Sequence, residues 1–243
     1  MDSKDASRAE TGRRPDEEWD WPSSSLLGGL GQAERDRLLT LGARMRYPAE
    51  RVLIREGDET DFVLILLDGL VKVTGRADDG RDALLAVRVG GDVVGELAAV
   101  DGQPRSATVT ACGPVLARSV TRVDFLACTR REPRIAHALH QTVVAKLRAA
   151  TTHRVTFTGC DAATRVARVL HHLAMTYGDP VGAGAEIRWP ITQPELATLA
   201  GASEPSVQKA LRGLKKAGVV TPGYRSIRVD DLDRLSEIAY PER

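Results

Sequence analysis

Residues 191–220 read ITQPELATLAGASEPSVQKALRGLKKAGVV and carry the sharpest fold signal in the chain. Thr192 followed three residues later by Glu195 is the pattern of a capping box, which begins a helix. Gly201 stands where a tight turn needs a residue that tolerates positive φ. Ser203 is then placed to cap a second helix. This spacing predicts a helix-turn-helix.

Each of the two predicted helices has one apolar face. Val207, Ala210 and Leu211 recur at helical spacing in the second helix, and Leu196 and Leu199 do the same in the first. We expect these residues to pack against one another. The polar side of the second helix is then left exposed.

The segment after the turn is strongly basic. Residues 203–228 hold six lysines and arginines against one acid, a net charge of +5 in a chain whose total is +1. The sequence VVTPGYRSIRVDD after Gly218 predicts two short strands around a Pro-Gly turn, which is the pattern of a wing. A charged helix face is usually only solvated, but joined to the helix spacing and a wing it indicates DNA binding.

Several residues of this unit are candidates for DNA contact. They are Thr192, Gln193, Ser203, Ser206, Gln208, Lys209, Arg212, Lys216 and Arg225. The basic side chains among them are expected to hold phosphates. Ser206, Gln208 and Lys209 are the candidate readers of base edges in the major groove.

A second stretch, GELAAVDGQPRSAT, begins at Gly95 and gathers an acid and an arginine around a turn. The glycine predicts a tight turn into a short helix, whose free amides near Leu97 and Ala98 can point at an anion. Arg105 can offer a forked cationic partner to phosphate oxygens, and Ser106 adds a further donor.

Glu96 disfavours a phosphate but suits a ribose hydroxyl, which needs an acceptor. One arginine for a singly charged phosphate and one acid for a sugar describe a cyclic mononucleotide better than a triphosphate. No Walker-type lysine accompanies them. On the residues alone, a barrel turn in which Glu96 and Arg105 simply pair with each other explains the pattern equally well.

Residues 47–129 alternate short apolar runs with turn residues. RVLIREGDE, FVLILLDGLVKVTGR, DALLAVRVGGDVVGE and SATVTACGPVLARSV each read as strands, separated by EGDETD, DDG and DGQP. Many short strands at this spacing favour a barrel or jelly roll over a parallel sheet with helices.

After Pro133 the pattern becomes helical over about 25 residues. The residues that recur in alternating steps of three and four are Ala136, Leu139, Val143, Lys146, Ala150, His153 and Phe157. This is the spacing of a coiled-coil seam, made imperfect by its two polar members. Because such a helix is long for a chain of this size, pairing with a second copy is the natural way to cover its stripe, and we expect a homodimer. Asp161 is placed to cap the next helix.

The composition restricts other classes of function. No apolar run approaches the roughly 20 residues of a membrane span, and the N-terminus has no hydrophobic segment for export, so we expect a cytoplasmic protein without a membrane partner. Cys112, Cys128 and Cys160 form no CxxC pair, which gives no support to a metal or disulfide framework. His137 and His140 are explained by an ordinary helix surface, and we expect no metal. The sequence contains no acid–base or nucleophile–base motif, so we do not expect an enzyme.

GELAAVDGQPRSATVTA is similar to the phosphate-binding cassette of cyclic-nucleotide-binding domains, and EGDETDFVLILLDGLVKV adds glycines of those domains at Gly57 and Gly69. With the long helix and the winged helix-turn-helix, residues 26–235 resemble the catabolite activator/fumarate–nitrate regulator (CRP/FNR) family of bacterial transcription factors. The resemblance implies an α+β fold with an N-terminal β jelly-roll barrel that binds a cyclic nucleotide, a long dimerisation helix and a C-terminal winged helix-turn-helix. It also implies double-stranded DNA and RNA polymerase as partners.

The resemblance assigns roles within the cassette by position. Glu96 would take the ribose 2′-hydroxyl, while Arg105 and Ser106 would take the cyclic phosphate. The residues that would line the turn are Gly95, Leu97 and Ala98.

The resemblance leaves the base preference open. Members that respond to cAMP carry two adjacent hydroxyls at the positions of Ala150 and Thr151; only Thr151 keeps one here, although Thr152 follows. Ser106 after the arginine favours cAMP over cGMP, as it does in related domains. The alternative is a regulator of the same family that responds to a different nucleotide or to none.

The predicted DNA-reading helix departs from the family. Members similar to the enterobacterial activator carry an Arg-Glu pair where this chain has Glu204 and Pro205, and Lys209 stands where a second arginine would be. Bidentate contacts to guanine are therefore weakened or lost, and the DNA consensus of those members is not expected. The iron–sulfur branch of the family uses N-terminal cysteines, which residues 1–50 lack, and no histidine falls in the predicted strands as a haem ligand would.

These patterns divide the chain into four segments. Residues 1–25 have many charged and few aliphatic side chains and are predicted to be a disordered tail, on which Trp19 and Trp21 either dock to the body or stay exposed. The remaining segments are 26–131 for the barrel, 132–160 for the dimerisation helix and hinge, and 161–243 for the winged helix-turn-helix.

Overall fold

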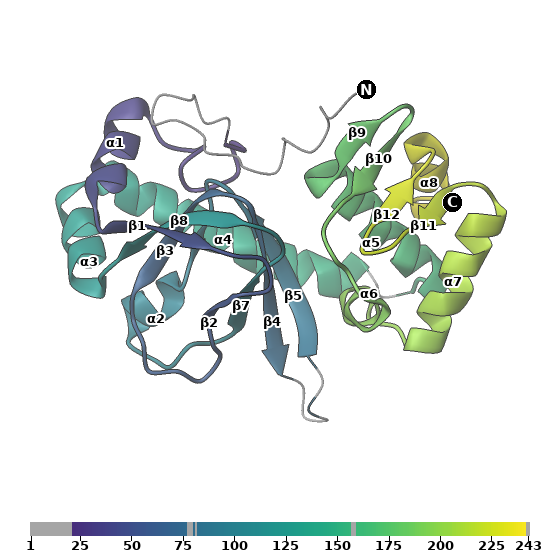
Figure 1. The fold of residues 1–243 in the computed structure, drawn as a ribbon, viewed down its shortest axis with the longest axis horizontal. Helices are drawn as coiled ribbons and strands as arrows, with labels where there is room; N and C mark the ends of the chain where they lie inside the picture. Colours follow the sequence, from purple (N-terminus) through teal and green to yellow (C-terminus); the bar gives the residue numbers. More distant parts are fainter. Residues whose placement is uncertain (1–20, 77–79, 81, 157–158, 242–243) are drawn as a thin grey trace, which may run out of the picture.

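A computed structural model describes residues 21–76, 80, 82–156 and 159–241 of the chain. The barrel and its helices hold α1 (Gln32–Thr40), β1 (Ala43–Tyr47), β2 (Val52–Ile54), β3 (Val63–Asp68), β4 (Leu70–Arg76), β5 (Asp82–Val89), β6 (Val93–Val94), α2 (Glu96–Asp101), β7 (Thr108–Ala111), β8 (Val115–Val120), α3 (Arg122–Arg131) and the long α4 (Pro133–Thr156). The C-terminal unit holds α5 (Ala162–Tyr177), β9 (Asp179–Val181), β10 (Gly184–Ile187), α6 (Gln193–Ala200), α7 (Glu204–Lys216), β11 (Val220–Pro222), β12 (Ile227–Val229) and α8 (Leu232–Ala239). Figure 1 shows the two parts beside each other.

Two four-stranded antiparallel sheets build the barrel, ordered β1-β8-β3-β6 and β2-β7-β4-β5. The predicted jelly roll of short strands is confirmed. The expectation of strands as far as residue 129 is wrong at its end, because α3 is a helix. Thr121 caps α3 by accepting a hydrogen bond from the amide of Asp124, a start signal that the apolar runs before it obscure.

The uninterrupted apolar run in β3 has a structural reason. β3 lies between β8 and β6, and both of its faces are buried. Val63 and Ile65 pack into a core shared with α1, α3 and α4, whereas Leu64 and Leu66 pack into the core between the two sheets. A strand that is buried on both faces has no position for a polar residue, so its sequence does not alternate.

Residues 21–25 lie against the barrel. The indole Nε1 of Trp21 donates a hydrogen bond to the carbonyl oxygen of Leu67 at 3.0 Å, and its ring packs against the core beneath α1. Ser25 is buried. Of the two tryptophans in the predicted tail, Trp21 therefore docks on the body, whereas Trp19 lies outside the described residues with most of that segment.

Helix α4 turns part of the predicted dimer seam toward its own barrel. Leu139 is 5% exposed and belongs to the core that the barrel shares with α1 and α3. Lys146 contacts Glu96 at the head of α2 and the carbonyl oxygen of Val93 in β6. The predicted seam register is therefore wrong at these two positions, because the barrel already covers this side of the helix. Val144 and Leu147 are the large apolar side chains that the described part of α4 leaves exposed. The last two predicted members, the side chain of His153 and Phe157, lie outside the described residues.

The C-terminal unit confirms the predicted helix-turn-helix and wing. Thr192 and Glu195 form the capping box of α6, Gly201 ends α6 with a φ of +55°, and Ser203 caps α7. Asp161 caps α5 as predicted. Strands β11 and β12 pair as the wing and continue into β10 and β9. In Figure 1, α6 lies toward the barrel and α7 on the outer side of the unit. None of the described helices is both long enough and apolar enough to cross a membrane.

Candidate nucleotide site and DNA-binding surface

Gly95 makes the turn that leads into α2. Its φ is +82°, a left-handed conformation that side chains disfavour. A Cβ atom at this position would lie 2.6 Å from Nη1 of Arg105 and 2.9 Å from Cδ1 of Ile54. The glycine therefore serves two purposes, because it permits the turn and leaves room for the head of the arginine.

Arg105 is 3% exposed, and its guanidinium is fixed against the inner side of this turn. Nη1 donates to the carbonyl oxygen of Gly95 at 2.8 Å and Nη2 to that of Phe62 at 2.6 Å. Nε donates to Oγ1 of Thr60 at 3.1 Å. The centre of the guanidinium also lies 4.7 Å from the centroid of the Phe62 ring. The side chain is thus held in one orientation by neighbours on two segments of the barrel.

The charge of Arg105 is not cancelled by a direct partner. Burial lowers its pKa, while the nearby carboxylates of Asp61, Asp58 and Glu96 act in the opposite direction. An arginine remains protonated under these conditions. None of the described carboxylates forms an ion pair with it, and the three hydrogen bonds above use three of its five N–H donors. The remaining N–H groups can donate to the oxygens of an anion.

Glu96, at the first position of α2, is 5% exposed and pairs with the long helix. Nζ of Lys146 lies 2.8 Å from Oε1 of Glu96 and 2.7 Å from the carbonyl oxygen of Val93. The structure therefore does not show the Glu96–Arg105 pair that was the other interpretation of this stretch. Sequence reasoning assigned Lys146 to a dimer seam; the signal that it belongs to this site was its charge in an apolar repeat.

The other predicted nucleotide contacts are placed around the turn or on α4. Ala98 is buried, whereas Leu97 and Ser106 are exposed. The hydroxyl of Thr151 donates to the carbonyl oxygen one turn earlier in α4, at 3.0 Å. The side chain of Thr152 lies outside the described part of the chain. The structure thus brings Gly95, Glu96 and Arg105 together and does not bring the α4 hydroxyl to them.

Helix α7 presents the polar face that the sequence predicts. Val207, Ala210, Leu211 and Leu214 are buried. The residues expected to meet DNA that lie exposed on it are Gln208, Lys209, Arg212 and Lys216. At the start of the helix, the hydroxyls of Ser203 and Ser206 lie 2.9 Å apart. The basic side chains therefore share one exposed side of the helix.

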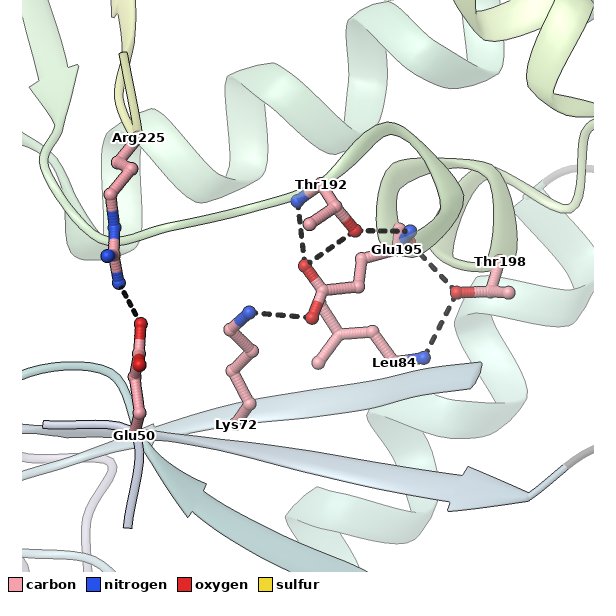
Figure 2. Close-up of polar contacts among 7 residues, drawn as sticks. All are labelled: Glu50, Lys72, Leu84, Thr192, Glu195, Thr198 and Arg225. Atoms are coloured by element: carbon pink, nitrogen blue, oxygen red, sulfur yellow. Dashed lines mark hydrogen bonds and ion pairs between the residues drawn. The ribbon is translucent and has the colours of Figure 1, made fainter. Parts of the chain in front are cut away.

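Two other residues expected to contact DNA lie beside the barrel, as Figure 2 shows. The amide of Thr192 donates to Oε2 of Glu195 at 2.7 Å, within the capping box. Arg225, in the wing, places Nη2 2.5 Å from Oε1 of Glu50, which raises the pKa of Arg225. Gln193, at the first position of α6, is exposed.

The cysteines and histidines form no further site in the described part of the chain. The three cysteines form no disulfide with one another, and burial raises the pKa of the Cys112 thiol to about 12. His137 and His140 are exposed on α4. The described residues contain no group of three or more histidines, cysteines and acids that could hold a metal ion.

Two segments match families of known domains. Residues 44–132 match the cyclic nucleotide-binding domain, and residues 164–238 match the Crp-like helix-turn-helix domain. The first match contains the Gly95 turn with Glu96 and Arg105, and the second contains α6, α7 and the wing. The two matches thus fall on the two surfaces described above.

Relatives resemble the chain over most of its length. The CRP-like cAMP-activated global transcriptional regulator of Mycobacterium tuberculosis is 31% identical over 193 residues, which are 79% of this chain and 86% of that protein. The cyclic AMP receptor protein of Thermus thermophilus is 30% identical over 217 residues, 89% of this chain and 97% of that protein. The solved structure of the c-di-GMP-responsive global regulator CLP of Xanthomonas campestris has the same fold, with a TM-score of 0.70 and 21% identity over 82% of this chain and 99% of that one.

Proposed function

This chain belongs to the CRP/FNR family of transcription regulators, which are not enzymes, and from that premise we propose that it is a homodimer whose sequence-specific DNA binding is controlled by cAMP. The observation that carries the proposal is the buried, hydrogen-bonded guanidinium of Arg105 beside the buried carboxylate of Glu96. A fixed cation next to a fixed acceptor fits the phosphate and ribose of one cyclic nucleotide.

Each part of the nucleotide has a proposed partner. The cyclic phosphate meets Arg105 and the exposed hydroxyl of Ser106, and a ribose hydroxyl donates to Glu96. Gly95, Leu97 and Ala98 line the turn. Thr151 or Thr152 closes the site over the base. For Thr151 to do so, its hydroxyl must leave its present acceptor in α4.

Lys146 couples the binding of a ligand to the position of the long helix. A ribose hydroxyl that donates to Glu96 competes with Lys146 for the same carboxylate, so the setting of α4 against the barrel depends on occupancy. α4 leads to the segment before Asp161 and so to the DNA-binding unit. Recognition helices of a dimer must lie roughly 34 Å apart to enter successive major grooves, so a small rotation changes the affinity for DNA. A coupling of about 1–3 kcal/mol, roughly 5- to 150-fold, is typical.

On the DNA, the exposed basic residues of α7 hold phosphates while Ser206, Gln208 and Lys209 meet base edges. The exposed apolar side chains of α4, Val144 and Leu147, form the dimer contact. RNA polymerase is the proposed downstream partner, because regulators of this family act with it.

A second candidate is a regulator that responds to a different nucleotide. The observation that favours it is the position of Thr151, whose hydroxyl is used within its own helix, next to an alanine where cAMP-responsive members have a hydroxyl. The fold also occurs in a regulator described as responsive to c-di-GMP.

Calorimetric titration of cAMP, cGMP and c-di-GMP into the purified protein tests the proposal. We expect saturable binding of cAMP and tighter binding of a fluorescent DNA duplex, selected from random sequences, when cAMP is present. The Glu96→Gln and Arg105→Ala variants should lose cAMP binding. Because Arg105 also supports the turn, Glu96→Gln is the decisive variant if Arg105→Ala unfolds. If only cGMP or c-di-GMP saturates the protein, that nucleotide and not cAMP is the effector. If a folded dimer binds none of the three nucleotides, control by a nucleotide is overturned.

A further inference from the structure

The DNA-binding unit covers an open edge of the barrel. β5 is the last strand of the sheet β2-β7-β4-β5, so the backbone groups on its outer side have no strand partner. A side chain of helix α6 provides a hydrogen-bond acceptor instead, since the amide of Leu84 donates to Oγ1 of Thr198 at 3.0 Å (Figure 2). Leu84 and Val87 are each 3% exposed and share a core with Leu196 and Leu199. The contact is therefore packed as well as hydrogen bonded.

A shielded ion pair lies next to this contact. Nζ of Lys72, on β4, is 2.6 Å from Oε1 of Glu195, and the two side chains are 14% and 13% exposed. The same carboxylate forms the capping box, since its Oε2 accepts from the amide of Thr192 at 2.7 Å. One side chain thus holds the start of α6 and fastens it to the barrel.

The tip of the wing makes the third contact. Arg225 pairs with Glu50, and these are the only non-glycine residues with positive φ in the part of the chain that the structure describes, at +57° and +66°. Such backbone conformations are sparsely populated and cluster at switch regions. Here the two strained positions present their side chains to each other across the boundary between the barrel and the DNA-binding unit.

We propose that this surface is an autoinhibitory latch, in which the barrel edge and DNA compete for the same side of the DNA-binding unit. The proposal rests on the proposed function. Arg225 is expected at a DNA phosphate and pairs with Glu50 of the barrel. Thr192, another candidate DNA contact, donates its amide to Glu195, the residue that pairs with Lys72 of the barrel. The Glu50 carboxylate pairs with the guanidinium of Arg225 in the place where a DNA phosphate would bind. The exposed face of α7 is not covered, so the latch blocks the phosphate contact of Arg225 and the seating of the wing.

The test weakens the latch from the barrel side and leaves the DNA-binding unit intact. In Lys72→Gln the capping box and every candidate DNA contact remain. Losing a positive charge weakens DNA binding by itself, whereas opening the latch strengthens it, so the two effects have opposite signs. Arg44→Gln, on exposed β1 in the other sheet, removes the same charge away from the latch and is the matched control.

Two readouts are measured on the full-length protein without nucleotide. Hydrogen exchange of residues 82–89 reports whether the Leu84 amide is still covered, and we expect Lys72→Gln to lose protection there while Arg44→Gln does not. Fluorescence anisotropy with a DNA duplex should show about fivefold or more tighter binding for Lys72→Gln. Glu195→Gln, which preserves a capping box, should do the same despite the opposite change of charge. The double variant should gain no more than either single one.

The outcomes separate the latch from the proposed function. If the wild type binds DNA with nucleotide, and Lys72→Gln behaves as Arg44→Gln in both readouts, the latch is overturned. Additive gains from the two single variants would also contradict it, because one contact can be opened only once. If no variant binds any duplex even with nucleotide, the proposed function fails and the competition fails with it.

Discussion

The ammonium of Lys146 in α4 lies 2.8 Å from the carboxylate of Glu96 at the head of α2, although fifty residues separate them in the sequence. Their side chains are 20% and 6% exposed, so solvent screens the pair only partly. The contact fixes how the long helix sits on the barrel beside the candidate nucleotide site. The stability of the barrel and the properties of that site are therefore linked through one ion pair.

Lys146→Gln should lower the free energy of unfolding by about 1–3 kcal/mol, because Glu96 keeps its burial and loses its charged partner. Urea denaturation measures the effect. In a Glu96→Gln background the same substitution should lower the free energy of unfolding by less, since no buried carboxylate then loses its charged partner. Arg148→Gln, exposed on the same helix, is the control and should stay within about 0.5 kcal/mol of the wild type. Equal costs in both backgrounds would show that Lys146 does not act through Glu96.

Gly95→Ala should abolish nucleotide binding and lower the melting temperature. The new Cβ meets Nη1 of Arg105 at 2.6 Å and also forces alanine into a φ of +82°. Gly57→Ala separates the two causes, because Gly57 has the same φ of +82° but nothing within 4 Å of an added Cβ. We expect Gly57→Ala to cost only the conformational part, about 1–2 kcal/mol, and to keep nucleotide affinity. Loss of nucleotide binding in Gly57→Ala would contradict this division.

Leu147→Asp should convert the proposed dimer into a monomer, because Leu147 is 66% exposed on α4 and belongs to the stripe that the barrel does not cover. Sedimentation velocity gives the mass. Val123→Asp is the control, since Val123 is 73% exposed but lies on α3 and not on α4. A dimer that survives Leu147→Asp would place the interface elsewhere. Leu139, by contrast, is a core residue, and a charge there should unfold the barrel.

Asp92→Asn should stabilise the protein at neutral pH. Burial raises the pKa of Asp92, so folding favours its protonated form. The stabilising contribution of that proton is present at low pH and is lost as pH rises through the folded-state pKa. Asparagine keeps an oxygen for the Val89 amide, which now donates to Oδ2 at 3.1 Å, and carries no charge. The difference in unfolding free energy should shrink as the pH falls. A gain that is independent of pH would exclude this cause.

Gln208 and Lys216 should affect DNA binding differently. Lys216→Ala removes a proposed phosphate contact, so it should weaken binding to all sequences and reduce the salt slope by about one. Gln208→Ala should relax the preference at one base pair and cost about 1–3 kcal/mol on the preferred site alone. Anisotropy at several salt concentrations, with a preferred and a scrambled duplex, distinguishes them. Identical profiles for the two variants would mean that Gln208 reads no base.

The caps and turns that the sequence predicted correctly are local. The capping box of Thr192 and Glu195, the turn at Gly201 and the cap at Ser203 each depend on hydrogen bonds between residues a few positions apart. The turn at Gly95 is of the same kind. For such features the chain spacing itself sets which groups can meet, so reading the residues in order was sufficient. The register of α4 was not local, and it was predicted incorrectly at Leu139 and Lys146.

The sequence alone determined the strands of the barrel before α3, the helix-turn-helix, the glycine turn with its acid and arginine, and the charge of α7. Only the tertiary structure decided that Glu96 pairs with Lys146 and that Arg105 is held by carbonyl oxygens. It alone placed Thr198 on the amide of Leu84, 114 residues away. The physical reason is that a side chain finds a distant partner only after packing has fixed the rotation of each helix and the open edge of each sheet, and neither quantity is carried by the spacing of residues along one segment.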